Sequence, residues 1–152
     1  MSMVVHAVPQ EDYEAWIDEQ LQPAEAPDDE LAAEGMAVFE QQCTSCHLVE
    51  GLNDDTYEGA AQTSGAAPNL THLASRGTYA GSIFNLWTDQ DGNEEVEIDE
   101  IGGHLERNQL EAWLRDPPGE KPLAPLQNRG MPNLGLAEGD IDALVAYLTT
   151  LD

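Results

Sequence analysis

Two cysteines and a histidine form the most chemically specific pattern in this chain. Residues 43–47 read Cys-Thr-Ser-Cys-His, and the chain has no cysteines besides Cys43 and Cys46. Cysteines this close together cannot hold a framework of disulfide-bonded loops. Two thiols one helical turn apart can, however, each add across a vinyl group of haem, and the next residue then offers an imidazole nitrogen to the iron. The pattern therefore predicts one covalent haem c attached through Cys43 and Cys46, with His47 as an axial ligand.

The same pattern has three other interpretations. A thioredoxin-like redox pair needs a preceding strand in a βαβ unit, which the sequence around Cys43 does not predict. A zinc site could combine both cysteines with two of His6, His72 and His104, although no second cluster has the spacing of a zinc finger. The two cysteines could also be close together by chance. We favour haem attachment over all three.

The elements that must position this motif are predicted to be mainly helical. A helix is expected over residues 31–42, directly before Cys43. Its apolar face, at three- and four-residue steps, comprises Ala32, Gly35, Met36 and Phe39. The last helix is expected over residues 138–151. Its apolar stripe comprises Ile141, Leu144, Val145 and Leu148, with Tyr147 beside it.

Further helices are expected between these two. Asn108 followed three residues later by Glu111 resembles a capping box. The helix that it opens would end at the pair Pro117 and Pro118. Its buried face would comprise Leu110, Trp113 and Leu114. Short helices are also predicted near residues 69–76 and 79–87.

The remaining segments are expected to be irregular or to precede the domain. Residues 1–8 have the alternation of a short strand, and residues 11–21 predict a helix after Pro9. Residues 21–30 carry prolines and charge but nothing to bury, which indicates a linker. Residues 48–68 lack periodicity, so something other than their own side chains should hold them. A helical domain with such long connections usually wraps a cofactor.

The charge of the chain is strongly negative. Thirty Asp and Glu residues against five Lys and Arg give a formal charge of −25. Residues 1–75 contain 15 acidic side chains and no Lys or Arg, and residues 89–100 add seven more acids. Nucleic-acid binding is excluded, because it needs a basic surface. We interpret the acidity as adaptation to concentrated salt, with an acidic docking surface for a basic partner as the alternative.

Length and hydropathy limit the class of protein further. The 152 residues, 41 % of them hydrophobic, suffice for one domain with a real core plus a tail. No apolar run approaches the ~20 residues that span a bilayer, and no signal peptide is expected before the domain. An EF-hand alignment on Gly92 puts Trp87 and Ile98 where carboxylates belong, so the acidic segment at 89–100 is not an EF-hand. A solvated acidic loop is favoured there over a looser calcium site.

Together these positions resemble class I cytochromes c over roughly residues 31–151. Gly35 and Phe39 precede the motif as in the first helix of that family, and Tyr147 occupies the corresponding position of the last helix. Pro68-Asn69-Leu70 matches the Pro-Asn-Leu of the family, whose proline carbonyl accepts the second ring N–H of the haem-binding histidine. The resemblance implies an all-α class I cytochrome c fold around one covalent haem c.

The resemblance also suggests which residues lie on the other side of the haem. The segment from Leu110 through Trp113 to Pro117 resembles Leu-x-x-Tyr-Leu-x-Asn-Pro, which lies beside the distal ligand in the family. That ligand should be Met131, whose soft thioether raises the reduction potential. His72 or His104 could replace it, although surface placement is the default expectation for both histidines.

Arg76 is the only basic residue near the predicted haem in sequence. By resemblance it could pair with a haem propionate, and an ordinary surface arginine is an equal alternative. Tyr79, Asn85 and Trp87 could also donate hydrogen bonds there. Trp87 and Trp113 are otherwise expected to be core residues.

The first twenty residues carry a second resemblance. Val8-Pro9 followed by Tyr13 and Trp16 is similar to the end of the copper-binding cupredoxin domain of cytochrome c oxidase subunit II. In that register Met1 stands at the copper-ligating methionine, while the other copper ligands are not in this chain. We therefore expect residues 1–20 to be a cupredoxin tail, 21–30 a linker and 31–152 a cytochrome c domain, excised from a longer fused subunit. An unrelated strand and helix is the alternative.

These resemblances imply a function in respiratory electron transport. Single electrons would pass from a quinol-oxidising complex or a small basic carrier, through the haem, to the dinuclear copper of the oxidase. The fragment alone would be an electron carrier, whereas the parent complex would be a proton-pumping cytochrome c oxidase. It would lie on the outer face of the cytoplasmic membrane, tethered through the parent subunit. The alternatives are an independent electron-transfer cytochrome c and a ligand-sensing haem domain.

Overall fold

The computed structural model describes residues 5, 7–55, 67–88, 103–123 and 130–152. Most of the strand expected at 1–8 and the whole acidic segment 89–100 lie outside these residues. Within them the helices are α1 Gln10–Gln20, α2 Glu30–Gln42, α3 Arg107–Arg115, α4 Pro117–Glu120 and α5 Glu138–Leu148. The same residues also form two antiparallel pairs of two-residue strands: β1 Thr78–Tyr79 with β2 Phe84–Asn85, and β3 Trp87–Thr88 with β4 His104–Leu105. The mainly helical architecture is confirmed, whereas the short strands were not expected.

Helix α2 starts one residue earlier than predicted, and a side chain explains its start. The carboxylate of Asp29 accepts hydrogen bonds from the backbone N–H groups of Leu31 and Ala32, at 3.0 and 3.1 Å. These bonds satisfy donors that the first turn of a helix leaves unpaired. Of the four residues on the apolar face found by periodicity, Ala32, Gly35 and Phe39 are buried, and Met36 is half-buried.

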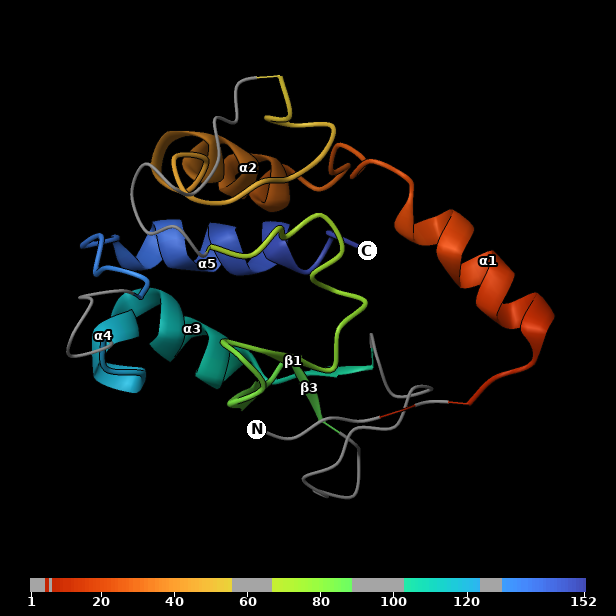
Figure 1. Ribbon diagram of the computed structural model, residues 1–152. Helices are drawn as coiled ribbons and strands as arrows, with labels where there is room; N and C mark the ends of the chain where they lie inside the picture. Colours follow the sequence, from red (N-terminus) through yellow and green to blue (C-terminus); the bar gives the residue numbers. More distant parts are fainter. Residues whose placement is uncertain (1–4, 6, 56–66, 89–102, 124–129) are drawn as a thin grey trace.

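Helices α2 and α5 cross in close contact, with α3 on the other side of α5 (Figure 1). A Cβ atom built at Gly35 would overlap the carbonyl group of Ala143 and come within 2.8 Å of the Cβ of Tyr147. One turn further along, the rings of Phe39 and Tyr147 meet edge to face, with centroids 5.5 Å apart. Only glycine at position 35 permits this crossing.

We expect Gly35→Ala to destabilise the domain despite the better helix propensity of alanine. Alanine in place of glycine inside a helix normally stabilises by up to about 1 kcal/mol. Here the added methyl group meets a backbone carbonyl, so α2 and α5 must separate, and overpacking of this kind costs about 1–3 kcal/mol. The free energy of unfolding, measured by denaturant titration, should fall accordingly. The control is Gly139→Ala on α5, where a Cβ meets nothing within 4 Å; equal stability of the two variants would contradict the close approach.

Two predicted short helices are wrong. Residues 71–75 form turns, because the side chain of Asn69 accepts a hydrogen bond from the backbone N–H of Thr71 (2.8 Å) and so competes with a helix. In the segment 79–87, Ala80, Gly81 and Ser82 have φ of 53°, 80° and 60°. Three consecutive left-handed residues reverse the chain between β1 and β2 and exclude a helix there.

The proposed capping box of α3 is also wrong. The helix starts at Arg107, with Glu106 at the N-cap position and no side-chain capping bond. Glu111 instead forms an ion pair with Arg107, at 2.6 Å, one turn away on the same face. The end of α3 before Pro117 is confirmed, and this proline then starts the short helix α4.

Helix α5 carries the predicted stripe but ends at Leu148, three residues early. The hydroxyl groups of Thr149 and Thr150 donate to the carbonyl oxygens of Val145 and Tyr147, at 2.9 and 2.7 Å. These bonds satisfy carbonyl groups of the last turn. The largest fully buried side chains, which define one apolar core, include Phe39, Leu86, Leu110, Ile141, Leu144, Tyr147 and Leu151.

Helix α1 lies apart from the other helices (Figure 1) and buries none of its residues. Its rings Tyr13 and Trp16 stack with centroids 5.9 Å apart and are 52 % and 49 % exposed. Residues 21–30 were expected to bury no side chain. Ala24 is nevertheless partly buried against the core, and its N–H donates to the carbonyl of Glu50 at 2.8 Å. Among the described residues, no helix is long and apolar enough to cross a bilayer.

Candidate functional site

The Cys-x-x-Cys-His motif forms a turn that continues from the end of α2. The N–H of Cys43 donates to the carbonyl of Phe39 at 2.8 Å, and the N–H groups of Cys46 and His47 donate to the carbonyl of Cys43 at 3.0 and 2.9 Å. The two thiols therefore lie one turn apart, as the spacing predicted. Both cysteines are free of disulfide bonds. Burial, with a smaller contribution from Cys46, raises the pKa of Cys43 to about 12, so this thiol is neutral at physiological pH.

The imidazole of His47 is held by one of its two nitrogens. Its Nδ1 lies 2.9 Å from the carbonyl oxygen of Pro68, which accepts the ring proton. This is the contact that the Pro-Asn-Leu segment implied, and it leaves Nε2 as the nitrogen that can bind a metal. Burial lowers the pKa of His47, while the hydrogen bond to Pro68 partly opposes that shift. The neutral form, which is the form that binds metals, is therefore favoured.

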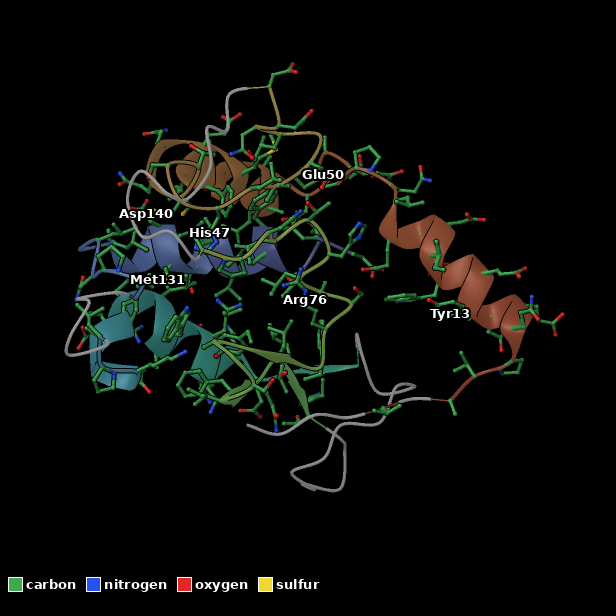
Figure 2. The ribbon with its side chains drawn as sticks, in the orientation of Figure 1. Tyr13, His47, Glu50, Arg76, Met131 and Asp140 are labelled. Carbon is green, nitrogen blue, oxygen red and sulfur yellow. The ribbon has the colours of Figure 1, made fainter. Side chains whose placement is uncertain are left out.

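Met131 packs against the apolar core and is half-buried. In the view of Figure 2, His47 is labelled over α5, Met131 between α5 and α3, and Arg76 nearer to the C-terminus. Tyr13, by contrast, projects from the separate helix α1. His47, Arg76 and Met131 come from the turn after α2 and from segments on both sides of α3 and α4.

Arg76 and Trp87 are both engaged within the chain. The guanidinium group of Arg76 donates from Nη2 to the carbonyl of Asn69 at 2.8 Å, and burial lowers its pKa. The side chain of Arg76 is half-buried. The ring N–H of Trp87 donates to the carbonyl of Ala74 at 2.9 Å. Trp87 is therefore a core residue, and its N–H is not available to a ligand.

Three aromatic side chains pack together between the first strand pair and α3. Trp113 is half-buried, with its ring 6.3 Å from Tyr79 and 5.7 Å from Phe84. The hydroxyl group of Tyr79 is buried and has no hydrogen-bond partner among the described residues. An unpaired buried hydroxyl costs about 1–3 kcal/mol. A bound group with acceptor oxygens, such as the propionates of haem, would satisfy it, so the residues present fit that group.

The two other histidines of the described chain differ from each other. His104 is exposed on β4, as expected. His72 was also expected at the surface, but it is only 8 % exposed, and neither ring nitrogen has a partner in the described part of the chain. No group of three His, Cys, Asp or Glu side chains among the described residues could hold a metal ion. The zinc interpretation therefore finds no support there; His6 lies outside these residues.

Sequence reasoning missed the side chains that hold the loop after the motif. Within residues 48–55 their own side chains contribute, while Thr71 from a later segment also holds the loop by accepting from the N–H of Glu50 at 2.9 Å. The side chain of Asn53 accepts from the N–H of Val49, and that of Asp54 accepts from the N–H of Gly51, both at 2.8 Å. The sequence signal was the Gly-Leu-Asn-Asp stretch, which is typical of side-chain-stabilised turns.

Comparison with known proteins agrees with this geometry. Residues 32–152 match the family model described as Cytochrome c. A cytochrome c oxidase subunit 2 of Alkalihalophilus pseudofirmus is 32 % identical over 155 residues, which cover 99 % of this chain and 34 % of that protein. A cytochrome c oxidase subunit 2 of Bacillus sp. strain PS3 is 32 % identical over 154 residues, which cover 99 % of this chain and 35 % of that protein. The chain thus spans about a third of the length of these relatives.

Proposed function

Because the chain belongs to the cytochrome c family, we propose that it is the haem c electron-transfer domain of a cytochrome c oxidase subunit II. The observation that carries this proposal is the Cys-x-x-Cys-His turn whose histidine is held by the carbonyl of Pro68 at 2.9 Å. The helical architecture fits a class I cytochrome c. The two subunit 2 relatives align with 99 % of the chain, including residues before position 32, where the family match begins.

In this proposal one haem c is bound through thioethers to Cys43 and Cys46. His47 would hold the iron through Nε2, and Met131 through its sulfur. When bound, the haem supplies a one-electron change between two oxidation states of its iron. Both residues would hold the iron in either oxidation state, so that little rearrangement would accompany the electron, and the apolar core beside Met131 would limit access of water.

Other side chains of the site orient these groups. Pro68 accepts the ring proton of His47, fixes the tautomer and makes the imidazole a stronger donor. Arg76, half-buried and fixed to Asn69 by a hydrogen bond of 2.8 Å, would place positive charge beside a propionate. Tyr79 would donate its buried hydroxyl to the same group. Trp113 would lie beside Met131 and limit access of small molecules to the iron.

The electron-transfer partners of the domain are inferred from the oxidase subunit of which it would be part. The domain would take electrons from a quinol-oxidising complex or a small carrier and pass them to the dinuclear copper centre of subunit II. Residues 1–20 would be the end of the copper-binding domain, and residues 21–30 the linker to the cytochrome c domain at 31–152. The membrane-associated parent would hold the domain at the outer face of the cytoplasmic membrane. A formal charge of −25 would attract a basic donor over a long range.

An absorption spectrum tests this function. Protein produced with the haem-attachment machinery should give the reduced-minus-oxidised spectrum of a low-spin haem c. The oxidised form should show a weak band in the red that marks sulfur–iron ligation, and its mass should exceed that of the polypeptide by one haem. The reduced protein should not bind carbon monoxide, because both axial positions are filled. Carbon monoxide binding by the native form would instead favour a ligand-sensing domain, and a colourless protein would overturn the proposal.

A further inference from the structure

Asn53 fixes the backbone of the haem-attachment turn from outside the motif. Its side chain is buried, at 5 % exposure. The amide Nδ2 donates to the carbonyl of His47 at 3.0 Å and lies 3.4 Å from that of Thr44, while Oδ1 accepts from the N–H of Val49 at 2.8 Å. A single side chain thus joins the turn that carries His47 to the loop that follows it.

The acceptor of the His47 ring proton is held equally firmly. Next to Pro68, the side chain of Asn69 donates from Nδ2 to Oε1 of Glu50 at 3.1 Å. The hydroxyl of Thr71 accepts from the N–H of Glu50 at 2.9 Å and donates to Oδ1 of Asn69 at 2.6 Å. Thr71 is 2 % exposed, so these bonds are shielded from water. In Figure 2, Glu50 and His47 come from the same loop after α2.

These two groups of hydrogen bonds meet at the contact between His47 and Pro68. We propose that Asn53, Asn69 and Thr71 form a His47 clamp that sets the orientation of the imidazole plane. Asn53 fixes the backbone from which the imidazole projects, and Asn69 and Thr71 fix the carbonyl to which the ring is bonded. A ring held at both points cannot turn about its side-chain bonds. The three residues are positioning residues, and the inference rests on the proposed function of His47 as an iron ligand.

The clamp should affect the iron through the basicity of the imidazole. A short, well-aligned hydrogen bond from Nδ1 makes the imidazole a stronger electron donor and so favours oxidised iron. When the clamp is weakened, the ring turns and the bond to Pro68 lengthens. The oxidised state then loses stabilisation, and the midpoint potential rises.

Two sets of variants of the haem-loaded protein test the clamp. Asn53→Ala removes every bond of the amide, and Asn108→Ala, on the exposed surface of α3, is its matched control. Thr71→Val removes the hydroxyl while keeping the shape of the side chain, and Thr71→Ser restores the hydroxyl. The measurements are the midpoint potential and the paramagnetically shifted haem-methyl NMR signals of the oxidised form, which report the orientation of the axial imidazole.

We expect Asn53→Ala and Thr71→Val to raise the midpoint potential and to change the spread of the methyl signals. Asn108→Ala and Thr71→Ser should match the unmodified protein. If Asn53→Ala does not fold, the comparison of Thr71→Val with Thr71→Ser still tests the clamp. Unchanged potential and methyl signals in the haem-loaded variants would overturn the clamp. Failure of the proposed function is distinguishable, because the unmodified protein would then show no histidine-ligated haem.

Discussion

Replacing Cys43 and Cys46 together by alanine is expected to abolish covalent attachment of haem. Both thioether bonds need a sulfur atom at these positions, and the chain has no other cysteine. After denaturation, mass spectrometry should give the mass of the polypeptide alone, whereas the unmodified chain should retain one haem. The variant should also be less stable, because a group bound only by the folded state stabilises that state.

The single variants serve as controls for this result. Cys43→Ala and Cys46→Ala should each keep one thioether bond and therefore the mass of one haem, at lower yield. Cys43 is 6 % exposed, so its replacement also removes a buried sulfur from the core. Retention of haem through denaturation by the double variant would refute attachment at the motif.

Replacing Met131 by alanine is expected to open the sixth position of the iron. The thioether favours the reduced state, so its loss should lower the midpoint potential. Axial ligands tune haem potentials over roughly 0.8 V, and we expect a fall on the order of 0.1 V or more. The weak red band should vanish, and the reduced protein should now bind carbon monoxide. Redox titration and difference spectroscopy measure these changes.

Met36→Ala is the matched control for Met131→Ala. Met36 is half-buried on α2 and packs against the same core as Met131. Its replacement should cost stability through lost packing, on the order of 1–2 kcal/mol for a half-buried side chain, but leave the potential and the red band unchanged. If Met131→Ala keeps both properties, another side chain binds the iron. Substitution of His72, which is buried without a partner in the described part of the chain, would then be the next experiment.

The long helices could be predicted from the sequence because their signal is local and repeated. The apolar positions of α2 recur at three- and four-residue steps, and the structure buries three of them and half-buries Met36. The same holds for the stripe on α5. The attachment motif needed only five adjacent residues. The contact between His47 and Pro68 spans 21 positions, and resemblance to a family, not periodicity, pointed to it.

Some of the missed features depend on single local turns, and others on side chains that meet across the fold. Asn69 and the left-handed residues at 80–82 turn the chain where composition alone suggested short helices. Thr71 pairs with Glu50 across 21 residues, and no local pattern marks such a pair. His72 is buried by neighbours that the sequence around it does not specify. Hydrogen bonds between a side chain and a distant part of the backbone therefore cannot be predicted from local sequence patterns.

The crossing at Gly35 and Ala143 has a consequence for how this domain tolerates change in length. The crossing joins the two ends of the domain and closes the chain between them into one large loop. The entropy lost on closing a loop grows with the logarithm of its length, by about 0.6 kcal/mol for each doubling. Residues added to or removed from the acidic segment 89–100 should therefore change this closure entropy little, so the crossing of α2 and α5 should tolerate such changes in length.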